Sequence, residues 1–423
     1  MSKLTIHQKE KFNEIFSLIK KEEKKILLKG SAGVGKTWLV NSIVSALALR
    51  VKPYKILCSA PTHKALSVIK SKVQNKEIVF KTVHSVLQYK SVIDLETGER
   101  TFKSDPSDKW PPLKHIAYWI IDEASMIDTE MLKTIEKHAK IQGTVVIFVG
   151  DGKQLNPVGE QDSPVFMQGY PEVELTEIIR QGEGNPIIYL SRNIPKIWDK
   201  TPLTIDSDEG IPEGYLYTQN LAKIIEELAR VNGTDEFKYL AWTNKEVDKI
   251  NTLVRNRIYG DNPAKIELEE TIVFKEPYKK YTTNEELKVE QLEEQVLNKR
   301  ITLKDTNKET ITEMVKFEVY YINKEILVLK DSSLATYKKY LAIINKNCKE
   351  KSLSYEEKAV FMSIFASFQY NHAITVHKSQ GSTYKTTVLN LRDINLNQNL
   401  EEKQRLLYTG VTRASELLIL YNL

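Results

Sequence analysis

The sequence has few cysteines and no long apolar run, and each of these absences excludes a class of protein. Its two cysteines in 423 residues, Cys58 and Cys348, lie far apart and outside any C-x-x-C pair or Cys/His cluster. We therefore expect no structural zinc site and a reducing compartment. Residues 1–10 lack the apolar core of a signal peptide, and no run approaches the ~18 apolar residues of a membrane span, so we expect a soluble, intracellular protein.

The sequence also lacks a large excess of either positive or negative charge. Lys plus Arg number 61 and Asp plus Glu number 56, which gives a net charge of +5. This mildly basic balance permits a polyanionic partner without requiring one. Hydrophobic residues make up 41% of the chain, enough for sizeable cores, and the length predicts about two to four domains.

The most informative segment fits the phosphate-binding pattern G-x-x-x-x-G-K-[ST]. Its residues are Gly30, Ser31, Ala32, Gly33, Val34, Gly35, Lys36 and Thr37. An apolar run precedes it and a helical pattern follows, so its backbone N–H groups and the helix start would face phosphate oxygens. Lys36 would reach the β- and γ-phosphates and Thr37 would hold Mg²⁺. A glycine-rich turn is the alternative, but the context favours a nucleoside triphosphate site.

Polar residues follow two other strand patterns. Asp122 and Glu123 end an apolar run at residues 118–121, where a carboxylate holds magnesium in phosphate-loop enzymes. Asp122 suits that role, and Glu123 would activate the attacking water; solvated turn acids are the alternative. Gln154 follows the next run, and because neighbouring strand ends of a parallel sheet face one crevice, we expect it to sense the γ-phosphate.

The first half of the sequence alternates apolar runs with helical patterns. Runs typical of strands lie at residues 26–29, 55–59, 117–121 and 145–149. Helical patterns begin near His7, Thr37, His63 and Thr129. This alternation predicts an α/β fold with a parallel sheet covered by helices on both faces.

A second α/β region occupies the rest of the chain, with two interruptions. Its strand patterns lie at residues 237–242, 384–391 and 417–421, and its helical patterns at 246–259 and 401–413. The first interruption, residues 86–114, is expected to carry a hairpin, because β-prone runs at 91–95 and 100–102 flank a turn that contains Gly98. The second, residues 268–369, shows strand patterns at 316–321 and 325–329 and charged helical runs at 285–299 and 336–368.

Two lone arginines, Arg180 and Arg413, occur in otherwise apolar or hydroxyl-rich segments. A surface salt bridge is the common role of such a residue, and contact with phosphate is the alternative. Together with the motifs above, however, the two arginines belong to a larger set of sequence motifs that follow one another along the chain. The segments of that set are residues 4–8, 30–37, 60–65, 82–85, 122–125, 150–158, 175–181, 241–244, 375–381 and 408–414.

In order and spacing, over residues 4–423, this set resembles the superfamily-one DNA helicases of the 5′-to-3′ branch, the group of the Dda and RecD helicases. The resemblance implies two RecA-like cores with ATP in the cleft between them. Residues 1–178 would form the first core, with the hairpin insertion at about 86–114. Residues 179–267 and 370–423 would form the second, and residues 268–369 an accessory domain with SH3-like strands and helices.

The resemblance also implies roles for single residues. Lys36, Thr37, Asp122, Glu123 and Gln154 would serve ATP from the first core. Arg180 and Arg413 would act as arginine fingers from the second. Gln8 would contact the adenine edge, and Gly381 would border the nucleotide.

The residues expected to contact single-stranded DNA divide between the cores. Those of the first core are Pro61, Thr62, His63, Thr82 and His84; those of the second are Asn244, Thr375, His377 and Lys378. Loop-end hydroxyls, amides and imidazoles can bind phosphate and sugar without recognising sequence. Tyr89, Trp110 and Trp242 are candidates for base stacking, with core packing the alternative for Trp110.

We therefore expect an ATP- and Mg²⁺-dependent DNA helicase that translocates 5′ to 3′ and works as a monomer on single strands and forks. Replication or recombination proteins are the expected partners, and the cytoplasm of a bacterium or a phage-infected cell the location. An RNA helicase or translocase, an accessory subunit and a kinase-like phosphate-loop enzyme are the rival functions. The hairpin would act as a strand-separating pin, or would merely stiffen its insertion.

Overall fold

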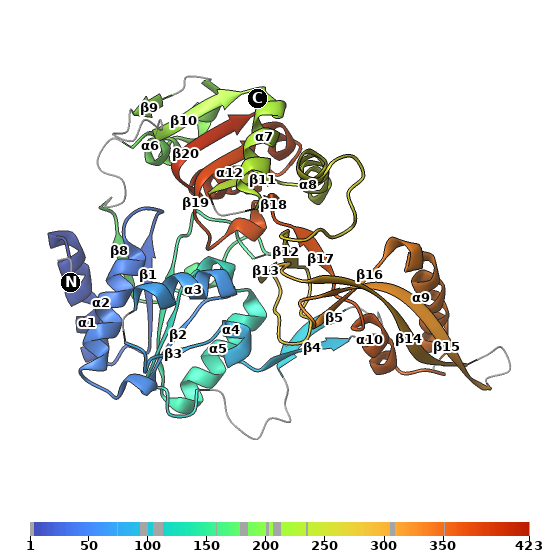
Figure 1. The fold of residues 1–423 in the computed structure, drawn as a ribbon. Helices are drawn as coiled ribbons and strands as arrows, with labels where there is room; N and C mark the ends of the chain where they lie inside the picture. The colour runs from blue at the N-terminus through green and yellow to red at the C-terminus, as the bar shows by residue number, and fades with distance from the viewer. Residues whose placement is uncertain are drawn as a thin grey trace. The chain divides into compact units, whose positions relative to one another are not determined.

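The first half of the chain builds a parallel sheet, as the alternating pattern predicts (Figure 1). The computed structural model describes residues 4–73, 75–93, 100–104, 113–157, 159–177, 185–199, 203–205, 213–233, 236–304, 309–350 and 352–422. Neighbouring strands of this sheet are all parallel. Their order is β3 (Val79–Phe80), β2 (Ile56–Ser59), β6 (Tyr118–Ile121), β7 (Val145–Gly150), β1 (Lys25–Gly30), β8 (Glu172–Leu175).

Helices cover both faces of this sheet, because its strands are apolar on both sides. Leu28 and Cys58 face one cluster, which contains α1 (Ile6–Lys20), α2 (Lys36–Ala48) and α3 (His63–Lys72). Leu27 and Leu57, one position along, face the opposite cluster, which contains α4 (Val83–Val86) and α5 (Thr129–Gln142). The helix starts lie where the sequence predicts them.

A second sheet is parallel except at one edge. Its order is β18 (Ala373–Thr375), β11 (Phe237–Ala241), β19 (Tyr384–Asn390), β20 (Ala414–Tyr421), β10 (Glu213–Thr218), β9 (Leu203–Ile205), with β9 antiparallel. Its core includes α6 (Pro186–Arg192), α11 (Leu391–Asn395) and α12 (Leu400–Val411), and α7 (Leu221–Val231) contacts β11. Two parallel α/β cores confirm the predicted fold class.

By its contacts the chain divides into two compact units. The first holds both of these sheets and consists of Met1–Tyr89, Ser104–Ile250 and Ala373–Leu423. The second consists of Lys90–Lys103 and Asn251–His372. Helix α8 (Asn244–Tyr259) includes the boundary between them. The finer domain limits expected from the sequence stay a prediction.

The second unit contains residues 90–103 of the first predicted insertion and all of the second, residues 268–369. The strands β4 (Tyr89–Ile93) and β5 (Arg100–Ser104) pair with each other, as the hairpin pattern predicts, and residues 94–99 lie outside the described chain. Two further sheets have the orders β13 (Glu286–Lys288), β12 (Thr271–Phe274), β17 (Phe368–Tyr370) and β14 (Leu292–Lys304), β15 (Thr310–Ile322), β16 (Ile326–Leu329). They share an apolar core. Whether they form an SH3-like barrel stays a prediction.

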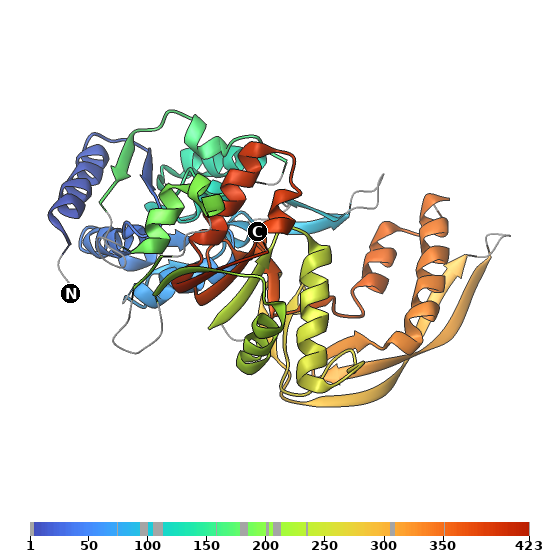
Figure 2. The same cartoon turned by 90° about the horizontal axis from the view of Figure 1, so that it is seen from above.

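One expectation for this unit is wrong. Residues 285–299 were predicted to be helical, yet they form β13 and the start of β14. β14 pairs with β15 along its whole length, and the paired strands lie beside α9 (Leu334–Lys349) (Figure 2). Ile301 and Leu303, two positions apart on β14, are buried in a cluster with residues of α9. This long pairing outweighs the helical propensity of a Glu-, Gln- and Leu-rich segment. Most of the run at 336–368 is helical as predicted, in α9 and α10 (Tyr355–Met362), whereas Phe368 begins β17.

Within the described part of the chain, no helix combines the length and the apolar character that crossing a bilayer requires. The same residues contain no group of three His, Cys, Asp or Glu side chains arranged to hold a metal ion. A magnesium ion bound mainly through phosphates needs no such group, because one or two protein oxygens suffice.

Candidate functional site: a nucleotide pocket formed by two cores

The glycines of the phosphate-binding pattern allow the loop between β1 and α2 to curl tightly. Gly33 and Gly35 have φ angles of 83° and 79°, a region that side chains disfavour. A Cβ atom on Gly30 would lie 2.7 Å from Val34 Cγ2. Helix α2 begins at Lys36, so its free N–H groups point toward the loop's interior. The loop therefore has the shape of an anion cradle.

The side chain of Lys36 lies within this curl. Its Nζ donates to the carbonyl oxygens of Gly30 at 2.6 Å and Ser31 at 3.0 Å. These bonds hold the ammonium group beside the backbone N–H groups at the start of α2. Positive charge and N–H donors thus converge on one place, which is the arrangement a polyphosphate needs.

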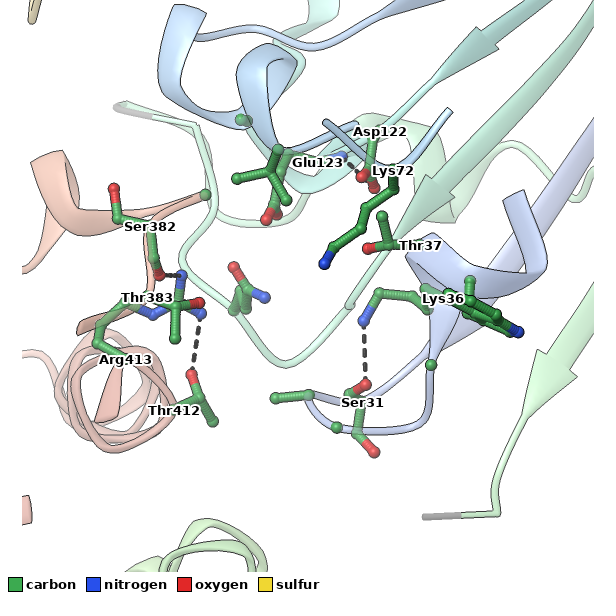
Figure 3. Close-up of a pocket in the computed structure, with 18 residues that line it drawn as sticks. Ser31, Lys36, Thr37, Lys72, Asp122, Glu123, Ser382, Thr383, Thr412 and Arg413 are labelled. Atoms are coloured by element: carbon green, nitrogen blue, oxygen red, sulfur yellow. Dashed lines mark hydrogen bonds between the residues drawn. The ribbon is translucent and has the colours of Figure 1, made fainter. Parts of the chain in front are cut away.

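A cavity of about 430 Å³ opens beside the loop (Figure 3). It lies within the first unit and is lined from both sheets. The predicted residues among its lining are Ser31, Ala32, Gly33, Gly35, Lys36, Thr37, Asp122, Glu123, Gln154, Gly381 and Arg413. The other lining residues are Trp38, Ala65, Val68, Lys72, Ser382, Thr383 and Thr412. Of the predicted nucleotide residues that the structure describes, Gly30, Val34 and Gln8 are not part of the lining.

Asp122 and Glu123 follow β6 at the edge of this cavity. Burial, and then the negative charge of Glu123, raise the pKa of Asp122 to about 7, while the Glu123 N–H and Lys36 act in the opposite direction. The Glu123 N–H donates to Asp122 Oδ1 at 2.9 Å. Glu123 has a φ of 52°, a conformation that few residues other than glycine adopt. A buried carboxylate of this kind is suited to a bound cation.

Gln154 supplies a buried hydrogen-bond acceptor that no described residue satisfies. Its side chain is 4% exposed and lines the cavity. Its Oε1 has no hydrogen-bond partner among the residues that the structure describes. Leaving such an oxygen unpaired costs about 1–3 kcal/mol, which a bound water or a ligand donor would recover.

Arg413 reaches the cavity from the second core and is fixed there by its own core. Its Nε donates to Thr409 O at 3.0 Å, and its Nη1 donates to Ser382 O at 2.9 Å. Figure 3 shows its guanidinium on the opposite side of the cavity from Lys36. The other predicted arginine, Arg180, lies outside the described residues.

Gln8 lies at the start of α1. Its backbone N–H donates to Thr5 Oγ1, and its Oε1 accepts from the Thr5 N–H, both at 3.2 Å, so that the pair caps the helix. Its Nε2 is buried and, within the described chain, has no hydrogen-bond partner. An unpaired amide donor here fits an acceptor on a base edge.

Seven of the lining residues were not among the site residues predicted from the sequence. Trp38 directly follows the phosphate loop, and Ser382, Thr383 and Thr412 adjoin predicted residues, so proximity in sequence could have indicated them. Lys72 is different, because it lies in the last turn of α3, outside every motif segment of the sequence. Figure 3 shows its ammonium group directed into the cavity.

The residues predicted to contact a single strand lie at strand ends in both cores. Pro61, Thr62 and His63 follow β2; Thr62 caps α3, and Thr82 caps α4 after the neighbouring strand β3. The His84 and Tyr89 rings lie 5.7 Å apart, and burial lowers the pKa of His84. These side chains share one edge of the first sheet.

The corresponding residues of the second core also follow paired strands. Asn244 begins α8 after β11, and Thr375 ends the neighbouring strand β18. Lys378 N–H donates to Thr375 Oγ1 at 3.3 Å. Trp242 is half-buried in this core, and Trp110 lies outside the described residues.

His377 has a less favourable setting for phosphate. It borders a second cavity of about 500 Å³ together with Glu160, Asp162, Glu401 and Glu402. Its Nε2 lies 3.7 Å from Glu402 Oε1. Burial lowers the pKa of His377, and the charge of Glu402 raises it in part. A neutral imidazole among carboxylates is suited to one hydrogen bond with a sugar or base rather than to charge pairing.

Gly381 marks a close approach of the two cores. Its φ is +73°, and a Cβ atom at this position would lie 2.7 Å from Ala65 Cβ and 3.5 Å from Thr62 Oγ1. Ala65 and Thr62 belong to α3 and its cap in the first core. The absence of a side chain at Gly381 therefore lets the cores meet beside the nucleotide cavity.

Comparison with known proteins agrees with this geometry. The model of an AAA domain matches residues 4–196, and that of the UvrD-like helicase C-terminal domain matches residues 370–421. The chain is 27% identical over 454 residues to the ATP-dependent DNA helicase Dda of Enterobacteria phage T4, with 97% of each chain covered. It is 26% identical over 446 residues to the RecBCD enzyme subunit RecD of Buchnera aphidicola subsp. Schizaphis graminum (strain Sg), covering 94% of this chain and 70% of that one.

A solved structure of two coordinating Pif1 helicases at forked double-stranded DNA is similar in fold. It has a TM-score of 0.51 and 20% identity, and the alignment covers 99% of this chain and 92% of that one. The chain is thus similar to DNA-processing P-loop helicases over 94–97% of its length, and it shares the fold of the solved structure. Within that class, the predicted resemblance to the superfamily-one helicases of the 5′-to-3′ branch is confirmed.

Proposed function

We propose that this chain is an ATP-dependent DNA helicase that translocates 5′ to 3′ on single-stranded DNA and unwinds duplex. The observation that carries this proposal is the cavity lined by the phosphate loop and Glu123 of one core and by Arg413 of the other. A site completed by two cores is active only when they close, so hydrolysis is coupled to their relative motion.

In this proposal the first core binds ATP and activates the attacking water. Lys36 and the N–H groups of the curled loop bind the β- and γ-phosphates. Thr37 and Asp122 supply hard oxygen ligands that would hold Mg²⁺, which neutralises charge on the phosphate oxygens. Glu123 orients the attacking water and accepts its proton, and Gln154 hydrogen-bonds to that water or to the γ-phosphate.

The second core completes the reaction. Arg413 stabilises the charge that develops on the transferred phosphoryl group, and related fingers contribute about 10³–10⁵ in rate. Arg180 is the proposed second finger. Gln8 pairs through its free amide with the adenine edge, and Gly381 borders the nucleotide.

DNA would lie across the strand ends described above. In the first core Pro61, Thr62, His63, Thr82 and His84 would contact it; in the second, Asn244, Thr375, His377 and Lys378. These groups suit phosphate and sugar better than base identity, as a motor that passes every base requires. We further propose that the β4–β5 hairpin separates the strands, that the motor works as a monomer, and that it acts in the cytoplasm beside replication or recombination proteins.

The test is unwinding of partial duplexes that carry either a 5′ or a 3′ single-stranded tail, with ATP and Mg²⁺. We expect separation of the 5′-tailed substrate and little of the 3′-tailed or blunt one. A nonhydrolysable ATP analogue on the 5′-tailed duplex is the control for passive melting. Equal unwinding of both tails would contradict the polarity, and hydrolysis that RNA stimulates but DNA does not would contradict the substrate.

A further prediction concerns closure at Gly381. We expect Gly381→Ala to lower kcat of ATP hydrolysis by about tenfold, because a side chain at positive φ costs roughly 1–2 kcal/mol and its Cβ atom would meet Ala65. Steady-state ATPase with saturating DNA measures this. Ala65→Gly in the same protein removes the atom that Gly381→Ala would contact and should restore part of the rate. Parental kcat in the single variant would contradict the close approach.

A further inference from the structure

One face of α12 docks onto the loop that carries Gln154. Arg405 Nη1 donates to the carbonyl oxygens of Gly152 at 2.8 Å and Gln154 at 3.0 Å. One turn further along the helix, Thr409 Oγ1 accepts from the Leu155 N–H at 3.2 Å. Because α12 belongs to the second core and the loop follows β7 of the first, these bonds join the two cores.

Tyr408, between these two residues, reaches deeper. Its hydroxyl donates to Asp151 Oδ2 at 2.6 Å and accepts from the Ala32 N–H at 3.1 Å. Tyr408 is 4% exposed and Asp151 is 2% exposed. Burial and the adjacent Asp151 raise the pKa of Tyr408, so the hydroxyl keeps the proton that it donates. One hydroxyl of the second core thus binds both the loop of Gln154 and the third residue of the phosphate loop.

We propose that Tyr408 is a positioning residue that transmits closure of the two cores to the phosphate loop and the Gln154 loop. The inference rests on the proposed function, because it assumes that the closed cleft is the hydrolysing state. Opening the cleft would take the hydroxyl away from both Asp151 and Ala32. The two bonds therefore stabilise only the closed arrangement, in which Arg413 also lines the cavity beside the phosphate loop.

This assignment predicts a particular kinetic signature. The phosphate loop and Lys36 belong to the first core alone, so ATP binding to the open protein does not need Tyr408. A group whose bonds form only on closure affects the rate of the chemical step rather than ground-state binding. A tyrosine that merely packs in the core would lower stability and leave kcat of the folded protein unchanged.

Tyr408→Phe tests this, because it removes one oxygen and keeps the ring. We expect kcat for ATP hydrolysis to fall about tenfold or more, as for loss of a hydrogen bond to a charged group, while KM for ATP changes less than about threefold. Tyr170→Phe is the matched control, since the Tyr170 hydroxyl also donates to a carboxylate, Glu136 Oε1 at 2.7 Å, but entirely within the first core. It should keep the parental kcat.

Asp151→Asn, alone and combined with Tyr408→Phe, identifies the bond. In Tyr408→Phe the buried carboxylate of Asp151 loses its donor, which costs more free energy than a buried neutral amide would. The double variant, which carries that amide, should therefore hydrolyse ATP at least as fast as Tyr408→Phe alone. Losses that multiply in the double variant, or a parental kcat in Tyr408→Phe, would overturn the proposal. Thermal melting shows whether each variant is folded. If Tyr408→Phe does not fold, Asp151→Asn, which changes the acceptor of the same hydrogen bond, tests the proposal in its place.

The same preparation separates this inference from the helicase assignment. If the parent hydrolyses ATP but fails to unwind tailed duplexes, the proposed function fails. The ratio of kcat values between Tyr408→Phe and the parent would still decide the role of Tyr408, because it is measured on hydrolysis alone.

Discussion

Replacing Lys36 by alanine is expected to lower ATP hydrolysis by at least about a hundredfold, the usual effect of removing one preorganised donor from a charged transition state. The Lys36 ammonium lies inside the curled loop, held by Gly30 O and Ser31 O, where the phosphates would bind. The two bonds have a charged donor and contribute about 1.5–3 kcal/mol each, so the variant's stability must be measured beside its activity. The measurements are ATPase with saturating single-stranded DNA and thermal unfolding.

Lys70→Ala is the control for this variant. Lys70 is an exposed lysine on α3 that does not line the nucleotide cavity, so its removal changes net charge equally without touching the site. It should hydrolyse ATP at the parental rate. If Lys36→Ala also turned over near the parental rate, the loop at residues 30–37 would not be the phosphate site.

The sequence predicts those parts of the structure that are determined by residues close together in the chain. The phosphate loop is one, since its glycines, the preceding apolar run and the following helical pattern adjoin one another. The strands on either side of Asp122 and Gln154 are another, because buried parallel strands are apolar along their length. Both cores and most of their helix starts follow from such patterns.

The parts that the sequence does not predict depend on distant partners. Residues 292–299, the first part of β14, were expected to be helical because their pairing with β15 leaves no signal in their own composition. Lys72 reaches the cavity only because α3 ends beside the phosphate loop in space. The bond between Tyr408 and Asp151 joins residues 257 positions apart, which no local pattern can indicate.

The motif residues themselves have some features that the local sequence predicts and others that depend on distant parts of the fold. Gln154 was predicted from its place after a strand, but its unpaired Oε1 is visible only in three dimensions. His377 was predicted from the resemblance to contact DNA, yet its carboxylate neighbours come from segments near residues 160 and 400. Spacing identifies which side chains share an edge of a sheet, whereas their electrostatic setting depends on the whole fold.

Glu123→Gln is expected to bind ATP normally and to turn it over at least about a hundredfold more slowly. A glutamine keeps the size of the side chain and the N–H that donates to Asp122 Oδ1, but its amide cannot accept a proton from water. The strained φ of 52° is the same for either residue, so the fold should not change. Equilibrium binding of ATP and single-turnover hydrolysis, measured on the same protein, separate the two effects.

Glu130→Gln serves as the matched control, because Glu130 is an exposed glutamate in the first turn of α5, outside the cavity. It should retain both binding and turnover. Removing the charge of Glu123 also removes one cause of the raised pKa of Asp122, which favours the ionised carboxylate that would hold magnesium. ATP binding in Glu123→Gln should therefore equal or exceed that of the parent. Weaker binding with an unchanged rate per bound ATP would instead place Glu123 in nucleotide binding and remove it from the chemical step.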